Sequence, residues 1–342
     1  LTFHPKMRLS VVILNWNGRQ HLEQFLPSVV EHTPAAAEIV VADNGSTDDS
    51  VAFLREHYPT IRIITLQKNY GFAEGYNRAL EQVDAEYFVL LNSDVEVTAG
   101  WLEPLVATLT NNRRLAAVAP MLRSYGYRDR FEYAGAAGGY IDFLGYPFCR
   151  GRILSTVEQD RGQYDTPRDV FWASGAAFCC RADLFRLLGG FDADFFAHME
   201  EIDLCWRMQL AGYRIMVEPR SVVYHLGGGT LPNESPQKLY LNYRNNLSML
   251  FKCAPTWQRI VVAVARPVCD MLSAALYFLR GNTTLGKAIL RAYRDFLDAH
   301  GELNKKRHMI RSARKAESRQ IYSGSIVLRY ALGRKTFDDM MK

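Results

Sequence analysis

The sequence lacks the motifs of several common functional classes. Its six cysteines contain no Cys-x-x-Cys pair, so a zinc site of the usual spacing is excluded, and we expect the unpaired thiols of a reducing compartment. The glycine-punctuated stretch 69–77 has neither the Gly-x-Gly-x-x-Gly spacing of a dinucleotide site nor that of a P-loop. No internal repeat, low-complexity segment or signal-peptide pattern stands out.

Acidic residues are scarce in the last part of the chain. Residues 280–342 hold 15 Lys and Arg against 6 Asp and Glu, a balance of +9, whereas residues 1–279 hold 26 against 30, a balance of −4. Such an asymmetry predicts an anionic partner, either a membrane surface or a nucleic acid. The tail lacks the interleaved aromatic pattern of a single-strand binder and shows no helix-turn-helix or zinc module, so we expect no nucleic acid and prefer the membrane.

No apolar run is free enough of charge to predict a membrane-spanning helix. Residues 239–252 and 257–298 have helical patterns, and the most apolar part contains Arg266 and Asp270. A charged residue at the bilayer centre costs about 2.5–3.5 kcal/mol. We therefore expect helices that lie on a membrane surface, and the alternative is plain packing against the rest of the chain. The aromatic residues expected on the lipid side are Trp257, Tyr277 and Phe278.

Apolar runs of strand length alternate with helical patterns through the first 120 residues. The predicted strands are 9–15, 38–42, 61–66, 86–91 and 115–119. This alternation predicts a parallel, doubly wound sheet. Residues 121–170 have weak periodicity and predict loops and short strands. Beyond them the pattern indicates strands at 170–180, 214–217 and 221–225 and helices at 182–188 and 201–211.

Carboxylates follow two of the predicted strands, at the edge where open α/β sheets bind ligands. Asp43 opens Asn-Gly-Ser, so it can accept hydrogen bonds from a nucleobase or ribose, or it can form a local turn. Asp94 follows Asn92 and Ser93. Divalent cations on a diphosphate prefer such hard oxygen ligands, with Asn92 assisting and Glu96 in reserve, and a helix cap is the alternative for Asp94.

Carboxylates also crowd the segment 191–207. Glu200, Glu201 and Asp203 lie so close together that repulsion between like charges raises the pKa of some of them. A carboxylate tuned in this way suits a general base that takes a proton from a hydroxyl. Asp203 and Arg207 are four residues apart on a predicted helix, so we expect a structural salt bridge between them.

His225 ends a short predicted strand and precedes three glycines. A neutral imidazole at such a place can complete the coordination of a metal. A core histidine bonded to the backbone is the alternative, and the flexible glycines beside it favour the metal ligand. The stretch 227–236 is a candidate lid over the site.

Together these segments resemble the inverting nucleotide-sugar glycosyltransferases of family 2, which have the GT-A type fold. The similarity runs from about Leu9 to Pro255. The matching stretches are 11–18 (VVILNWNG), 40–48 (VVADNGSTD), 69–73 (NYGFA), 90–94 (LLNSD), 174–177 (SGAA), 189–192 (GGFD), 200–207 (EEIDLCWR) and 224–229 (YHLGGG). The subgroup is similar to the rhamnosyltransferases of bacterial polysaccharide and lipopolysaccharide assembly.

The resemblance implies an α/β chain of GT-A type, with a Rossmann-like, mostly parallel sheet, flanking helices and a C-terminal helical extension. Residues 1–238 would form the catalytic domain, with nucleotide-sugar binding in 9–120 and the acceptor and catalytic part in 121–238. Residues 239–342 would form a basic, amphipathic extension that associates with the membrane surface.

The resemblance also implies roles for individual residues. Asp43 contacts the nucleobase or ribose, Glu201 acts as the catalytic base with Glu200 beside it, and Asp94 and His225 hold Mg²⁺ or Mn²⁺. The donor-binding set is Leu14, Asn15, Asn17, Asp43, Asn69, Gly71, Asn77, Asn92 and Ser93, and the acceptor-binding set is Trp172, Ser174 and Gly175.

Two residues depart from the family pattern. Asn92 stands where the first Asp of the Asp-x-Asp motif is usual, and Glu201 stands where a catalytic Asp is usual. The expected reaction transfers a sugar by single displacement, from dTDP-rhamnose as first candidate or a UDP-sugar next, to a hydroxyl of a lipid-linked or polysaccharide acceptor. The expected location is peripheral, at the cytoplasmic face of the inner membrane. Because of the two departures, an inactive nucleotide-sugar-binding scaffold is the alternative.

Overall fold

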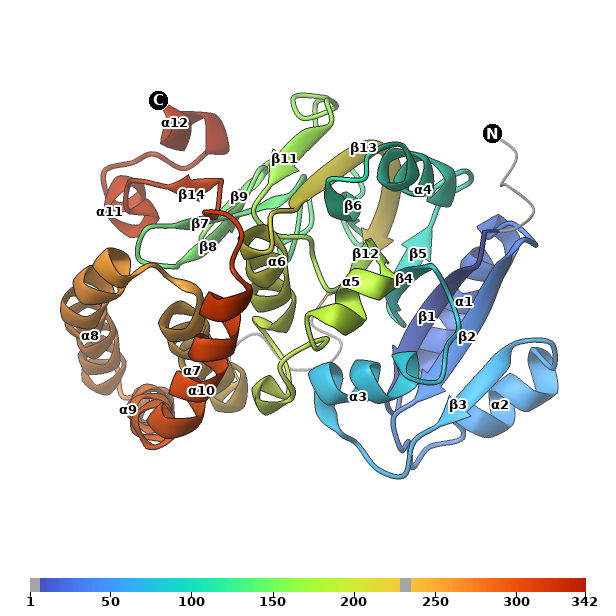
Figure 1. Ribbon diagram of the computed structural model, residues 1–342, viewed down its shortest axis with the longest axis horizontal. Helices are drawn as coiled ribbons and strands as arrows, with labels where there is room; N and C mark the ends of the chain where they lie inside the picture. Colours follow the sequence, from blue (N-terminus) through green and yellow to red (C-terminus); the bar gives the residue numbers. More distant parts are fainter. Residues whose placement is uncertain (1–6, 228–234) are drawn as a thin grey trace.

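A mixed sheet of nine strands runs through the part of the chain that the computed structural model describes, residues 7–227 and 235–342 (Figure 1). Its strand order is β11-β13-β6-β12-β4-β1-β2-β3, and β5 pairs with β13 outside this path. The strands are β1 (Leu9–Asn15), β2 (Ala37–Asp43), β3 (Arg62–Thr65), β4 (Tyr87–Asn92), β5 (Val95–Val97), β6 (Leu115–Ser124), β11 (Arg168–Val170), β12 (Ala177–Arg181) and β13 (Arg214–His225). The helices that accompany them are α1 (Arg19–His32), α2 (Ser50–His57), α3 (Gly71–Leu80), α4 (Leu102–Asn111), α5 (Ala182–Leu187), the short 3₁₀ turn η1 (Ala193–Phe195) and α6 (Glu200–Leu210).

The first half of the sheet is parallel, as the sequence predicts. β1 pairs in parallel with both β2 and β4, and β2 pairs in parallel with β3. β1 is buried on both faces, since Val12 belongs to one apolar cluster and its neighbours Val11 and Ile13 belong to another. Burial on both faces explains why this strand reads as a nearly continuous apolar run. The register sets Asn15 opposite Asp43 at the carboxyl ends of β1 and β2.

The second half of the sheet departs from the prediction. Segment 170–180 is not one strand, because β11 ends at Val170 and β12 runs antiparallel between β4 and β6. The predicted strands 214–217 and 221–225 are one strand, β13, whose pairing with β6 shifts register between Glu218 and Val222. β5 has only three residues, too few to show a periodic pattern, and it forms because it pairs with the end of β13.

The region 121–170 contains the expected short strands. They are β7 (Gly139–Asp142), β8 (Pro147–Cys149), β9 (Arg152–Ile153) and β10 (Thr156–Val157). β14 (Ile321–Tyr322) adds in parallel to β7, so the last part of the chain completes this small sheet. The extension and the middle of the chain therefore share this sheet. The domain boundary expected at residue 238 stays a prediction. All six cysteines are unpaired, and five of them are buried.

The C-terminal extension is helical, as predicted, and lies at the end of the molecule away from β2 and β3 (Figure 1). Its helices are α7 (Pro236–Cys253), α8 (Thr256–Leu279), α9 (Thr283–Asp298), α10 (His300–Ala313), α11 (Ile326–Ala331) and α12 (Phe337–Met341). The predicted helix 257–298 is thus two helices, α8 and α9. α7 packs against α9, α10 and α6, so the extension rests directly on the helix that begins with the paired glutamates.

Candidate active site

A cavity of about 520 Å³ lies where the ends of β4 and β13 meet the start of α6. The predicted site residues in its lining are Asn92, Asp94, Ser174, Gly175, Glu200, Glu201 and His225. The fold therefore brings together the residues proposed for metal binding and for base catalysis, although long stretches of chain separate them.

Strand pairing places Asp94 beside His225. β5 runs antiparallel to β13 so that Val95 lies opposite His225, and the backbone N–H of Leu226 donates to the carbonyl of Asp94 (3.1 Å). Nε2 of His225 lies 3.2 Å from Oδ1 of Asp94, and Nδ1 lies 3.3 Å from Oε1 of Glu132. All three side chains are buried, so little water screens their charges.

Burial and charge together set the protonation of this trio. Burial opposes the charged imidazolium, but the carboxylates of Asp94 and Glu132 outweigh it and raise the pKa of His225 to about 10. Burial also favours the neutral form of Asp94, and the positive charge of His225 outweighs that effect, so the pKa of Asp94 is lowered. In the absence of a cation, His225 and Asp94 therefore form an ion pair at neutral pH.

The side chains of His225 and Asp94 fit a divalent cation whose other ligands come from a diphosphate-bearing substrate. Neither ring nitrogen of His225 has an aligned hydrogen-bond partner among residues 7–227 and 235–342, so a cation at Nε2 can replace the proton there. A carboxylate at the other nitrogen, here Glu132, is the usual partner that orients a metal-binding histidine. Over the same residues no three His, Cys, Asp or Glu side chains form a metal cluster by themselves. A cation here would need further ligands, which the oxygens of a bound diphosphate can supply, as is common for Mg²⁺.

The paired glutamates are the first two residues of α6. Burial, reinforced by the charge of Glu201, raises the pKa of Glu200 well above its usual value. Burial raises the pKa of Glu201 to about 7, although backbone N–H groups at the helix start favour its carboxylate. Oε2 of each glutamate is buried and has no hydrogen-bond partner in the described part of the chain. A carboxylate with a pKa near 7 and an unused acceptor oxygen in a cavity meets the requirements of a general base.

The turn before α6 has an unusual backbone. Phe196, His198 and Met199 have φ values of 62°, 70° and 73°, which residues other than glycine rarely adopt. Asn245 of α7 holds this turn, because its Nδ2 donates to three carbonyl groups within residues 195–198 at 2.7–2.9 Å. A strained backbone of this kind persists only where surrounding contacts enforce it. The turn that Asn245 holds in this way sets the direction in which α6 begins, toward the cavity.

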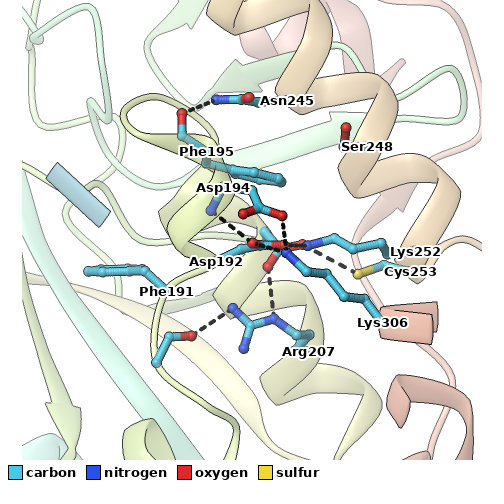
Figure 2. Close-up of polar contacts among 12 residues, drawn as sticks. Phe191, Asp192, Asp194, Phe195, Arg207, Asn245, Ser248, Lys252, Cys253 and Lys306 are labelled. Atoms are coloured by element: carbon cyan, nitrogen blue, oxygen red, sulfur yellow. Dashed lines mark hydrogen bonds and ion pairs between the residues drawn. The ribbon is translucent and has the colours of Figure 1, made fainter. Parts of the chain in front are cut away.

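A buried network of ion pairs fixes the next turn of α6 (Figure 2). Asp203 accepts from Arg207 (2.8 Å), as the sequence predicts, and it also contacts Lys252 of α7 (2.8 Å). Lys252 and Lys306 of α10 both contact Asp192, which precedes η1. The network therefore ties two helices of the extension to the helix that carries the glutamates.

Asp43 and its neighbours form a polar cluster at the ends of β1 and β2. Oδ1 of Asp43 accepts from Nδ2 of Asn15 (3.2 Å), and Oδ2 accepts from the backbone N–H of Ser46 (3.0 Å). Oδ1 of Asn17 accepts from the backbone N–H of Thr47 (2.7 Å) in the same loop. The local turn considered for Asp43 is thus present. The cluster lies outside the described lining of the cavity, and its contacts with a donor stay predictions.

Asn69, Gly71 and Asn77 make structural contacts. Oδ1 of Asn69 accepts from the backbone N–H of Gly71 (2.8 Å), and a Cβ at Gly71, whose φ is 79°, would clash with Phe196. The amide of Asn77 donates to and accepts from the backbone of Phe191 (2.9 Å each). Asn77 lines a second cavity, of about 590 Å³, and its contact with a donor stays a prediction.

Three other expectations concern residues away from the cavity lining. Leu14 and Ser93 are half-buried near the ends of β1 and β4, and their donor contacts stay predictions. Glu96, the reserve ligand, instead forms an ion pair with Arg128 (2.8 Å), so its charge is already balanced. The candidate lid falls largely on residues 228–234, which lie outside the described residues.

Of the predicted acceptor residues, Trp172 lies outside the cavity lining, and its contact with an acceptor stays a prediction. It is buried, donates from Nε1 to the carbonyl of Tyr140 (3.0 Å) and packs so tightly on Gly139 that no Cβ would fit there. Trp172 belongs to a large buried apolar cluster, and the apolar residues around it in the sequence also favour a core position. Ser174 and Gly175 do line the cavity, close to Glu201.

The cavity also contains polar residues that the sequence reading missed. They are Ser124, Tyr127, Arg130, Glu132, Tyr133, Ser155, His198 and Lys238. Burial and the charge of Lys238 lower the pKa of His198 to about 4, so this imidazole is neutral. Glu132 lies in a region of weak periodicity and gives no local signal. His198 lies two residues before the glutamates, and that proximity was a usable signal.

Comparisons with known proteins identify a family for this chain. The family model described as Glycosyl transferase family 2 matches residues 10–185, just over half of the chain. The N-acetylglucosaminyl-diphospho-decaprenol L-rhamnosyltransferase of Mycobacterium tuberculosis is 27% identical over 269 residues, which cover 73% of this chain and 86% of that protein. A pre-mycofactocin glycosyltransferase of the same organism is 29% identical over 223 residues, covering 64% of this chain and 42% of that protein.

Solved structures show the same fold at low sequence identity. GalNAc-T7 with UDP, GalNAc and Mn²⁺ superposes with a TM-score of 0.61 at 18% identity, over 76% of this chain and 50% of that chain. S. aureus TarS in complex with UDP-GlcNAc superposes with a TM-score of 0.55 at 16% identity, over 90% and 88% of the two chains. The mixed α/β sheet with flanking helices is thus confirmed as a GT-A type fold, and the chain belongs to glycosyl transferase family 2.

Proposed function

We propose that this protein is a metal-dependent, inverting glycosyltransferase of bacterial cell-surface glycan synthesis. It moves a sugar from a nucleotide-diphosphate donor to a hydroxyl of a lipid-linked or polysaccharide acceptor. The observation that carries the proposal is the position of Glu201, whose pKa is about 7, in the same cavity as Asp94 and His225. A base that is half-ionised near neutral pH can both take up and release a proton during turnover.

The reaction is a single displacement. Glu201 accepts the proton of the acceptor hydroxyl, whose oxygen bonds to the anomeric carbon while the bond from that carbon to the diphosphate breaks. Attack from the face opposite the diphosphate inverts the anomeric centre. Burial and the charge of Glu201 raise the pKa of Glu200 well above its usual value, so the pair favours a single negative charge over two. Asp94 and His225 would hold the divalent cation, which when bound neutralises charge on the departing diphosphate.

Likeness to characterised proteins supports the choice of substrates. The mycobacterial relative is named as an L-rhamnosyltransferase with a polyprenyl-diphosphate-linked sugar as acceptor. GalNAc-T7 and a Pyrobaculum calidifontis mannosyltransferase were solved with Mn²⁺ and a nucleotide or nucleotide sugar. We therefore place dTDP-rhamnose first among donors and UDP-sugars next, with Mg²⁺ or Mn²⁺ as the cation.

The basic extension supports a peripheral location at the cytoplasmic face of the membrane, where the enzyme would meet a lipid-linked acceptor. Residues 280–342 carry a net charge of +9, and anionic lipids attract such segments. A nucleotide-sugar-binding scaffold without turnover is the second candidate. It is favoured by Asn92 and Glu201, which stand where the family has aspartates.

A donor panel tests the proposal. The full chain is incubated with dTDP-rhamnose and a set of UDP-sugars, with Mn²⁺, with Mg²⁺ or with a chelator, in the presence of a polyprenyl-diphosphate-linked N-acetylglucosamine. Release of nucleoside diphosphate and extension of the acceptor are measured. Cation-dependent transfer from one donor is expected. Donor binding without release for every donor and cation would refute the enzyme and support the scaffold.

A further inference from the structure

Helix α8 presents an apolar stripe to the outside. Every exposed residue from Trp257 to Leu279 is apolar. Among them a series recurs every three or four residues and so follows one face of the helix: Trp257, Ile260, Val264, Val268, Leu272 and Leu276. Six of the exposed residues are each more than 60% exposed: Trp257, Ile260, Val264, Val268, Leu272 and Leu279. A contiguous exposed apolar stripe of this length marks an interaction surface.

The charges of α8 face the protein interior. Arg266 and Asp270 are buried and pair with each other at 3.2 Å. Arg266 also donates to Oδ1 of Asn246 (2.6 Å), and the hydroxyls of Tyr146 and Tyr293 donate to Asp270 (2.9 and 2.7 Å). A buried charge that loses its partners is costly, so these contacts fix the rotation of α8 about its axis. The apolar stripe therefore stays on the outside.

The same contacts favour a helix that lies in the membrane plane over one that crosses it. α8 is long and apolar enough to span a bilayer by length and composition. One face of it, however, packs on α9 and is bonded to Tyr146 of the middle of the chain. Crossing the bilayer would strip Arg266 and Asp270 of these polar partners, whereas lying in its surface leaves them in place.

Charge identifies a lipid surface as the occupant of the stripe. Basic residues predominate in the segment that follows α8, where 280–342 carry +9, and Arg280, Lys287, Arg291 and Arg294 are exposed close after the stripe. Two copies of so basic a segment would repel each other, whereas anionic headgroups attract it. Trp257 at one end of the stripe and Arg280 just beyond the other are residue types that favour the boundary between headgroups and acyl chains.

We propose that α8 is an in-plane membrane anchor whose apolar stripe enters the headgroup–acyl boundary of an anionic bilayer. The basic residues after it contact the headgroups, and the buried Arg266–Asp270 pair keeps the stripe turned outward. This deepens the membrane location proposed above and rests on it, but its test requires no sugar transfer.

Tryptophan quenching tests the insertion directly. Of the five tryptophans, Trp101, Trp172 and Trp206 are buried, so Trp16 and Trp257 report on the surroundings. The full chain is mixed with vesicles of phosphatidylglycerol and phosphatidylethanolamine that carry brominated acyl chains. Fluorescence should be quenched in the unaltered chain and in Trp16→Phe, and quenching should be lost in Trp257→Phe. Quenching that survives Trp257→Phe, or none in the unaltered chain, would overturn the proposal.

Charge placed in the stripe gives a second test. Val264→Glu and Leu272→Glu alter exposed side chains, so the fold should be retained, and flotation with the same vesicles should weaken roughly tenfold or more. Leu332→Glu, at a position 73% exposed near α11, is the matched control and should float normally. Part of the binding should resist high salt, because the apolar stripe is not screened.

Two further outcomes are informative. A dimer in sedimentation that dissociates in Val264→Glu, with no flotation of the unaltered chain, would assign the stripe to a second copy and overturn the anchor. A chain that inserts Trp257 into vesicles but transfers no sugar would refute the proposed function and leave the anchor supported.

Discussion

Replacing Glu201 by Gln should stabilise the protein above neutral pH while it abolishes sugar transfer. Burial raises the pKa of Glu201 from 4.5 to about 7, so the fold disfavours the ionised form. The stability that this carboxyl contributes is complete below its unfolded value of 4.5 and is lost as the pH rises through about 7. Glutamine cannot ionise and should keep that stability at every pH.

The magnitude follows from the same values. A rise from 4.5 to about 7 corresponds to about 3 kcal/mol, at about 1.4 kcal/mol for each pKa unit. Glu201 is partly exposed to the cavity and titrates together with Glu200, so part of this cost is screened or shared. We expect a measured gain of about 1–3 kcal/mol in the free energy of unfolding. For a chain of this size the melting temperature should rise by about 1–5 °C.

The assay compares thermal unfolding of Glu201→Gln with that of the unaltered chain, from below pH 4.5 to above pH 7. The difference in melting temperature should be small at the acid end and should grow until it levels off above neutrality. Glu56→Gln, exposed on α2, is the control and should give a flat, small difference. A variant that is less stable than the unaltered chain at alkaline pH, or a difference that does not change with pH, would refute the conclusion that burial raises the pKa of Glu201. Retained transfer would remove Glu201 as the base.

Three further predictions concern the surroundings of the site. Asp94→Ala should weaken Mn²⁺ binding in the presence of nucleoside diphosphate roughly tenfold or more, as measured by calorimetry. Asp84 is exposed, so the control Asp84→Ala should leave Mn²⁺ binding unchanged. An unchanged titration of Asp94→Ala would exclude Asp94 as a ligand. Asn77→Ala should lower the free energy of unfolding by about 1–3 kcal/mol and leave donor affinity unchanged, so a weakened donor with normal stability would contradict its structural role. Lys252→Met should lower the free energy of unfolding, measured with denaturant, by about 3–5 kcal/mol, because it leaves Asp192 and Asp203 short of a partner. Lys305 pairs with Glu302 on the surface, so the control Lys305→Met should lower it little. Equal losses of stability in the two variants would contradict the network.

Much of the α/β framework follows from local sequence. β1 and β4 are buried on both faces and β2 is buried from Val40 onward, so each contains a short apolar run. A polar residue after such a run must lie at the edge of a parallel sheet, which is why Asp43 and Asp94 could be singled out from sequence alone. The crowding of Glu200 and Glu201 is likewise local, and the charge of Glu201 adds to the rise in the pKa of Glu200, but burial is the main cause of the raised pKa of both residues.

Tertiary structure alone decided which of these residues meet. β5 is too short to show a pattern, yet its pairing with β13 is what places His225 beside Asp94. Glu132 contacts His225 from a region without periodicity in the sequence. Trp172, which the sequence suggested as a contact for the acceptor, is buried in the core. The outward stripe of α8 also depends on distant partners for Arg266. Local periodicity records which faces of an element are apolar, whereas pairing across long stretches of chain decides what each face or strand end touches.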